Sequence, residues 1–293
     1  MLRATMQSKQ FKMMVIGAFF LLSFIAWLGM QVYSHYYIST DDAYVNANTI
    51  QIAPRIVGSV MGLNVKNNQY VKKGDVLFSI DPTPYQLAVH SAKASLMLAE
   101  AELTNMTATD KRVSALVKKQ YLSAQDGDNA NARYQTALAK VEEAKAQLDE
   151  ATLNLNYTKV TAPTSGWITN LSLQTGSVVS ANQPLFALIS DEEFWVDVNF
   201  KETQMSAIKA GQKATVTVDM YPKHAFQGVV DSISGGTGTA FSLLPPQNAS
   251  GNWVKVTQRV PVRVRILNTD THYPLRIGTS AKAIIHLQSF VSA

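Results

Sequence analysis

The 293-residue chain contains no cysteine at all. This absence excludes disulfide bonds, catalysis by a thiolate and a lipid-anchored N-terminal cysteine. Charged residues make up only 16% of the chain, and its net charge of +5 is not gathered into a basic stripe with interleaved aromatic residues. Because such a stripe is the electrostatic footprint of nucleic-acid binding, we predict that the chain binds no nucleic acid.

The motifs of common catalytic sites are also missing. The five histidines have no metal-ligand spacing, and the sequence has no zinc-protease helix motif, phosphate loop or nucleophile elbow. Gly235, Gly236 and Gly238 are not followed by a helical pattern, so they are not a dinucleotide fingerprint. Paired carboxylates such as Glu142 and Glu143 are expected on the solvated face of a helix. We therefore predict that the protein is not an enzyme and has no cofactor or metal site.

A long uncharged segment near the N-terminus predicts a transmembrane anchor at residues 13–34. Its core, from Met14 to Met30, is almost wholly apolar and is long enough to cross a bilayer. Tyr36 and Tyr37 follow it in an aromatic cluster of the kind found at membrane–water interfaces. A cleaved signal peptide would instead have a shorter apolar region and a small-residue cleavage site, so the anchor is expected to be uncleaved.

The charges on either side of this segment predict its orientation. Three basic residues and no acidic residue precede it, whereas Asp41 and Asp42 follow it. By the positive-inside rule, residues 1–12 are expected in the cytoplasm. The protein is then a single-pass inner-membrane protein with the bulk of its chain on the outer side of that membrane.

Residues 83–156 are predicted to form two long helices folded into an antiparallel hairpin. In each helix, apolar or small residues recur at alternating spacings of three and four, which is typical of a coiled-coil seam. Asp110 is the one polar break in this pattern. The seam positions are Val89, Ala92, Leu96, Ala99, Leu103, Met106, Asp110, Val113 and Val117 in the first helix, and Ala130, Tyr134, Ala137, Val141, Ala144, Leu148, Ala151 and Leu155 in the second. Because the other faces are polar or small, the hairpin is expected to project.

Both helices have start signals in the sequence. Thr83 is expected to cap the first helix, with Gln86 closing a capping box, and Ser123 with Asp126 is expected to do the same for the second. The turn between the helices is expected near residues 118–122.

An internal repeat flanks the hairpin. Eight positions in residues 58–80 recur in residues 166–188 at a constant offset of 108. Each copy has strand-like spacing around a polar turn, in which Asn68 and Gly176 occupy equivalent places and both tolerate positive φ. Since the copies lie on either side of the hairpin, we expect them to interlock into one small β-sandwich.

These segments resemble the HlyD/EmrA family of membrane fusion proteins, the periplasmic adaptors of tripartite efflux pumps. Residues 58–81 and 161–186 are similar to the two half-motifs of that family's split lipoyl-like domain. Residues 194–212 and 241–264 are similar to the EmrA branch in particular. The resemblance implies a mostly β fold with an α-helical hairpin, and a lipoyl-like sandwich followed by a barrel.

The C-terminal third reads as short alternating strands typical of a small β-barrel. These strands are expected at residues 194–200, 213–219, 226–233, 259–267 and 281–287, with a short helix at 202–209. The predicted domains are residues 1–12, cytoplasmic; 13–34, anchor; 35–52, membrane-proximal strand; 53–82, first lipoyl-like half; 83–156, helical hairpin; 157–190, second lipoyl-like half; and 191–293, barrel and membrane-proximal strands.

The loop at residues 235–253 combines glycine and proline with four large apolar side chains. These are Phe241, Leu243, Leu244 and Trp253. Two interpretations stay open: the loop covers the open end of the barrel, or it contacts a transporter or the membrane surface.

Arg112, Leu116 and Ser123 lie at the predicted hairpin tip, at spacings of four and seven. They resemble the RLS tip motif with which adaptors engage a TolC-like outer-membrane channel. Arginine offers a fork of donors, leucine an apolar knob and serine a short hydroxyl near the bend. The alternative is that Ser123 only caps a helix, Leu116 belongs to the seam and Arg112 is a solvated charge.

The resemblance also implies the partners. They are an inner-membrane exporter of the major-facilitator type, a TolC-like channel and further copies of the chain in a ring or funnel, which together export drugs or other small toxic molecules. Alternatives are an adaptor of an ABC-type protein secretion system or of an aromatic-acid exporter. A membrane-tethered biotin or lipoyl carrier is a third reading, but Asp81, Pro82 and Thr83 occupy the place where a carrier has its modifiable lysine.

Overall fold

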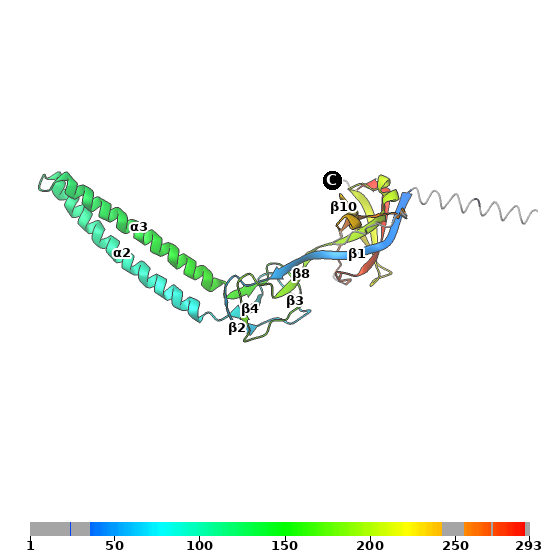
Figure 1. Cartoon of the computed structure of the whole chain (residues 1–293), viewed down its shortest axis with the longest axis horizontal. Helices are drawn as coiled ribbons and strands as arrows, with labels where there is room; N and C mark the ends of the chain where they lie inside the picture. The colour runs from blue at the N-terminus through cyan, green and yellow to red at the C-terminus, as the bar shows by residue number, and fades with distance from the viewer. Residues whose placement is uncertain (1–23, 25–35, 242–254, 271, 291–293) are drawn as a thin grey trace, which may run out of the picture. The chain divides into compact units, whose positions relative to one another are not determined.

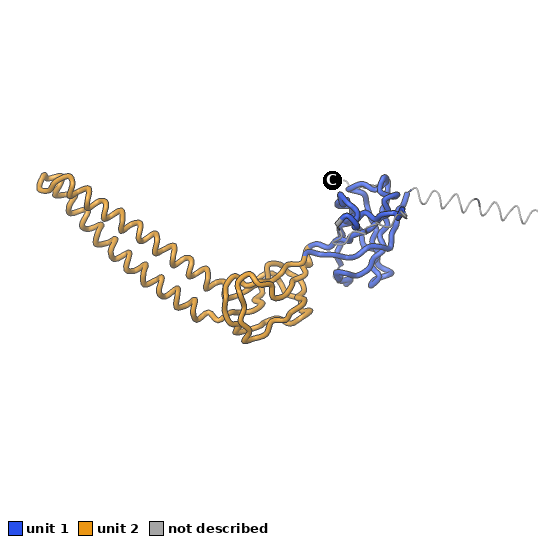
Figure 2. The backbone as a smooth tube through the Cα atoms, in the orientation of Figure 1, with its two compact units in different colours: residues 1–48, 193–293 blue, residues 49–192 orange. Residues whose placement is uncertain are grey.

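The computed structural model describes residue 24 and residues 36–241, 255–270 and 272–290, which are mostly β structure with two long helices (Figure 1). The chain divides into two compact units, residues 49–192 and residues 1–48 with 193–293 (Figure 2). Apart from residue 24, the apolar core of the predicted anchor lies outside the described residues. Among the described residues, no helix is both long and apolar enough to span a membrane.

The two repeat copies interlock in the unit of residues 49–192. The first copy supplies β2 (Gly58–Leu63), β3 (Tyr70–Val71) and β4 (Val76–Ile80), and the second supplies β6 (Gly166–Thr169) and β7 (Val178–Val179); β5 (Lys159–Thr161) comes just before the second copy. The antiparallel pairs β2 with β7 and β3 with β6 each join one strand of the first copy to one of the second, and β4 pairs with β5. Neither copy can therefore complete its sheets alone.

One hydrophobic core is shared by both copies. Phe78 from the first copy and Phe186 from the second meet edge-on, with ring centroids 6.0 Å apart. The polar turns also match: Asn68 and Gly176 both have positive φ, 64° and 88°, as their equivalent places predict. The expectation that the distant repeats form a single sandwich is confirmed.

The hairpin is built from α2 (Thr83–Lys118) and α3 (Ala124–Asn156), which extend away from the β part of their own unit (Figures 1 and 2). Every predicted seam position is buried or half-buried, and nearly all other positions of the two helices are exposed. Across the pair, the Nζ of Lys140 on α3 lies 3.1 Å from the Oε1 of Glu102 on α2. At about 1.5 Å of rise per residue, each helix is about 50 Å long.

The start of α2 differs from the prediction. Thr83 is not its cap: the N-cap is Pro82, which makes no side-chain capping bond, and the expected box with Gln86 is absent. Instead, the Asp81 Oδ1 accepts a hydrogen bond from the Thr83 backbone N–H at 2.9 Å. Pro82 already has helical backbone angles, so the helix begins one residue earlier than a cap at Thr83 requires.

The unit of residues 1–48 and 193–293 contains a closed six-stranded barrel. Its strands are β1 (Tyr37–Ile52), β8 (Phe186–Lys201), β9 (Gln212–Val218), β10 (Ala225–Ile233), β11 (Arg259–Ile266) and β12 (Ser280–Phe290). The order β1-β12-β9-β10-β11-β8 is closed by a pairing of β1 with β8, beside which the Thr40 hydroxyl donates to the Asn199 carbonyl. Where the sequence predicts a short helix at 202–209, the structure has the 3-10 helix η1 (Glu202–Ala207). A second 3-10 helix, η2 (Gly238–Phe241), lies in the segment predicted as a loop at 235–253. The barrel interior is lined by valine, isoleucine and phenylalanine side chains.

Candidate docking site at the hairpin tip

The tip begins where α2 ends in a left-handed residue. Gln120 has a φ of 61°, and its N–H donates to the Val117 carbonyl at 2.9 Å. The Tyr121 N–H donates to the Leu116 carbonyl at 3.0 Å. These two bonds are those of a Schellman motif, which satisfies carbonyls at a helix end and reverses the chain sharply.

The start of α3 is closed by a reciprocal capping box between Ser123 and Asp126. The Asp126 backbone N–H donates to the Ser123 Oγ at 3.3 Å, and the Ser123 backbone N–H donates to the Asp126 Oδ2 at 3.1 Å. The Ser123 hydroxyl also donates to that carboxylate at 2.6 Å. The predicted cap is confirmed, and the hydrogen of the Ser123 hydroxyl is already committed within the chain.

The predicted docking residues lie on the end of the rod. Leu116 is 41% exposed and lies outside the seam, which is occupied here by Val113 and Val117. Among the residues that the structure describes, the exposed Arg112 guanidinium donates only to the Thr109 Oγ1, at 3.3 Å. Leu116 is thus available to a partner as an apolar side chain, and most of the donors of Arg112 are free.

Two tip residues were missed by the sequence reasoning. Tyr121 is 75% exposed and Leu122 is 37% exposed, although both are large and apolar. They lie in the turn that the sequence predicts at residues 118–122, where polar residues are usual. The presence of tyrosine and leucine side by side in a predicted turn is the feature of the sequence that indicates them.

The other predicted contact residues are only partly described. Tyr36 is 41% exposed, and Tyr37 packs edge-on against His286 with ring centroids 5.1 Å apart. Met14, Met30, Leu243, Leu244 and Trp253 lie outside the described residues, as does the side chain of Phe241.

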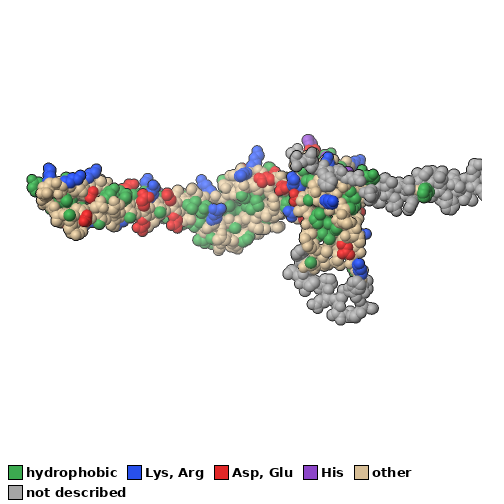
Figure 3. Space-filling model, turned by 90° about the horizontal axis from the view of Figure 1, so that it is seen from above, with side chains coloured by type: hydrophobic (Ala, Val, Ile, Leu, Met, Phe, Trp, Pro, Cys, Tyr) green, Lys and Arg blue, Asp and Glu red, His purple; other side chains and the backbone are tan. Residues whose placement is uncertain are grey.

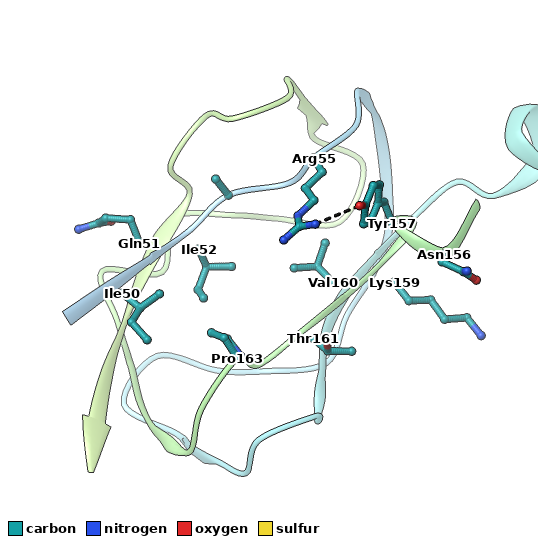
Figure 4. Close-up of a pocket in the computed structure, with 11 residues that line it drawn as sticks. Ile50, Gln51, Ile52, Arg55, Asn156, Tyr157, Lys159, Val160, Thr161 and Pro163 are labelled. Carbon is teal, nitrogen blue, oxygen red and sulfur yellow. Dashed lines mark hydrogen bonds between the residues drawn. The ribbon is translucent and has the colours of Figure 1, made fainter. Parts of the chain in front are cut away.

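A shallow pocket of about 480 Å³ lies at the base of the hairpin (Figure 4). Arg55 points across it toward Tyr157, donating to the phenol oxygen at 3.0 Å while its guanidinium lies 4.9 Å from the ring centroid. Its lining is Ile50, Gln51, Ile52, Ala53, Arg55, Asn156, Tyr157, Lys159, Val160, Thr161 and Pro163. In the part of the chain that the structure describes, no group of three histidine or carboxylate side chains could hold a metal ion.

Comparison with known proteins matches both units to described domain families. Residues 48–191 match the barrel-sandwich hybrid domain of RND membrane fusion proteins, and residues 193–286 match an AAEA-like β-barrel domain. The chain is 32% identical to the multidrug export protein EmrA of Haemophilus influenzae, over 93% of this chain and 83% of that protein. It is 36% identical to the fatty acid resistance protein FarA of Neisseria gonorrhoeae, over 82% of this chain and 74% of that protein.

The chain belongs to the membrane fusion protein family, on its EmrA-like branch. Members of this family are non-enzymatic adaptors that act with an inner-membrane transporter and an outer-membrane channel. Adaptors of the EmrA type are membrane-anchored and have most of their chain in the periplasm.

Solved structures show the same fold. The membrane fusion protein Spr0693 of Streptococcus pneumoniae R6 matches with a TM-score of 0.62 at 18% identity, over 86% of this chain and 99% of that one. A MacA–MexA chimera that carries the MexA α-hairpin domain of Pseudomonas aeruginosa matches with a TM-score of 0.57 at 25% identity, over 87% of this chain and 83% of the chimera.

Proposed function

We propose that this protein is the periplasmic adaptor of a tripartite efflux pump for drugs or other small toxic molecules. It joins a major-facilitator exporter in the inner membrane to a TolC-like channel in the outer membrane. The exposed tip of the hairpin is the observation that carries this proposal: Arg112, Leu116, Tyr121 and Leu122 all present side chains to solvent at the end of the rod. An apolar side chain beside a fork of donors suits a groove between helices whose rim offers carbonyls or carboxylates.

The rest of the chain anchors the adaptor, faces the transporter and associates with further copies. The apolar segment from Met14 to Met30 anchors the protein in a single pass, with residues 1–12 in the cytoplasm. The barrel unit faces the transporter. Several copies associate into a ring or funnel whose hairpins point toward the outer membrane. The similarity to the multidrug export proteins EmrA of Haemophilus influenzae and Escherichia coli supports drugs as the cargo.

A double substitution at the tip tests the docking step. Arg112→Asp with Leu116→Asp places two carboxylates where the proposal needs a donor and an apolar contact. We expect drug tolerance to fall to that of a strain lacking the protein, while the transporter still co-purifies with the variant. The matched control is Lys93→Asp with Leu98→Asp, which makes the same changes at exposed positions of α2 far from the tip.

A photo-crosslinking amino acid in place of Tyr121, which is 75% exposed, identifies the partner directly. We expect it to capture an outer-membrane channel in intact cells. Unchanged drug tolerance in the double variant, or no captured channel, would contradict the docking role of the tip.

A further inference from the structure

The end of the hairpin has the opposite charge to its shaft. Residues 111–133 carry five basic residues and two carboxylates, whereas the remaining helical residues carry three lysines and seven carboxylates. Figure 3 shows basic side chains gathered at the end of the hairpin and acidic ones along its middle. The rod is therefore electrostatically polarised along its length.

Four of the tip cations form one surface, which we call the basic face. Lys111 and Lys118 are seven residues apart, as are Arg112 and Lys119, so each pair lies on one line along the helix. All four are exposed, on the side of α2 opposite its seam. They surround Ala115, and Leu116 borders them.

The basic face is not neutralised within the chain. Among the described residues, no carboxylate oxygen lies within 4.0 Å of any of these four cations. The nearby Asp126 is engaged in capping α3. Lys118 and Lys119 complement the negative end of the α2 dipole, but Lys111 and Arg112 lie beyond the last turn, where the dipole has little effect. Stability of the helix therefore does not account for the whole cluster.

Further copies that lie in parallel, with tip beside tip, cannot neutralise it either. Each copy brings the same excess of three positive charges in residues 111–133, so a ring of copies accumulates charge at its end. Such a ring repels itself unless an anionic partner covers the tips. The partner must supply several carboxylates for every hairpin.

We propose that the tip docks on a protein rim lined with carboxylates, which pair with Lys111, Lys118 and Lys119 around the apolar contact of Leu116. This inference rests on the proposed docking function and adds the chemistry of the partner's surface. A protein fits better than an anionic membrane because the apolar side chains occur in a rigid, doubly capped turn, which suits a shaped groove. The cations attract the tip to the acidic rim during association, and Leu116 then makes the apolar contact.

The test uses the full chain in its own membrane, with the photo-crosslinker at Tyr121. In membranes, we expect the yield of captured channel to fall steeply as salt rises from 50 to 500 mM, because exposed charges are screened. Lys111→Glu with Lys118→Glu should lower the yield at least about tenfold at low salt. Lys111→Arg with Lys118→Arg should retain it. The matched control is Lys93→Glu with Lys145→Glu, two exposed lysines on the shaft, which should leave the yield unchanged.

Substituting carboxylates of the captured rim with lysine should restore the yield of captured channel in the variant with Lys111→Glu and Lys118→Glu, and this result would establish the pairing. A capture that is insensitive to salt and to the Lys111 and Lys118 reversals would overturn the acidic rim while leaving the docking function intact. Capture of nothing by the wild-type chain would overturn both. Capture of only a second copy, or lysine-dependent binding to anionic phospholipid vesicles without protein capture, would likewise overturn the proposal.

Discussion

Ser123 and Asp126 cap each other at the tip of the hairpin, with the serine Oγ 2.6 Å from the aspartate Oδ2 and the aspartate N–H donating back to that Oγ. This bond makes Ser123 a structural residue whatever else it contacts. A hydroxyl that is satisfied within its own chain has less to offer a partner than a free one. The two roles considered for Ser123 can be separated by substitution.

Ser123→Ala is expected to destabilise the first turn of α3 by about 1 kcal/mol, because the N-cap acceptor is lost. Ser123→Asn keeps a capping side chain without the hydroxyl and should restore this loss. Amide hydrogen exchange in residues 124–128 measures the effect. If Ser123→Ala lowers drug tolerance and Ser123→Asn retains it, the role of Ser123 is to shape the tip. An inactive asparagine variant with normal exchange would instead show that the hydroxyl itself contacts the channel.

Asp110→Leu is expected to stabilise the hairpin by about 1–2 kcal/mol, because it removes an unsatisfied polar atom from the seam. The Asp110 Oδ1 is buried and has no hydrogen-bond partner among the described residues. Asp110→Asn keeps a polar group at the site and should gain less. Exchange rates of amides on both helices near the tip report the change. Faster exchange in the leucine variant would show that the seam cannot accommodate the larger side chain.

Gly166→Ala should destabilise the β-sandwich more than Gly58→Ala, although the two glycines are equivalent in the repeat. A Cβ at residue 166 would overlap the backbone carbonyl of Ile189, which cannot move without breaking the β6–β8 pairing. A Cβ at residue 58 would lie 2.5 Å from the Ile80 Cγ2, a side-chain atom that can shift. We expect losses of about 3 kcal/mol or more and of about 1–3 kcal/mol respectively. Thermal unfolding measures both, and equal losses would contradict the argument.

The pKa of Asp81 is lowered because the Thr83 side chain and backbone N–H donate to its carboxylate. A depressed pKa means that this contribution to the start of α2 is present above the unfolded-state value of about 4 and is lost as pH falls through the lower folded value. Protection of the first α2 amides should therefore weaken below about pH 4 in the wild type. Asp81→Asn should show weaker protection already at neutral pH and no such transition. Identical pH profiles in the two proteins would exclude a role for the carboxylate.

The sequence predicts best the parts of this fold that depend on local periodicity. The coiled-coil seam, from Val89 to Val117, needs only the spacing of small and apolar residues, and the structure half-buries each of these positions. The internal repeat predicts both halves of the β-sandwich, because equivalent turns need residues that adopt equivalent backbone angles, as Asn68 and Gly176 do. The cap at Ser123 was found because its partner is three residues away.

Features that depend on distant contacts were missed or only approximate. The sequence predicts a cap at Thr83 because nothing in it indicates that Pro82 already adopts helical angles. Strand β8 is 16 residues long, whereas the sequence predicts a strand only at residues 194–200, because its first part pairs with β6. Closure of the barrel brings Thr40 to Asn199, a contact that no local pattern encodes. The exposure of Tyr121 depends on the left-handed angle at Gln120, which glycine would have signalled and glutamine does not.

Because both ends of the hairpin enter the same β-sandwich, its length is independent of the base that carries it. Removing seven residues from each helix at matching places shortens the rod by about 10 Å. The remaining seam residues of the two helices still face each other. The length of the hairpin can therefore change in steps of one heptad, by adding or deleting one heptad in each helix, without any change to the β-sandwich.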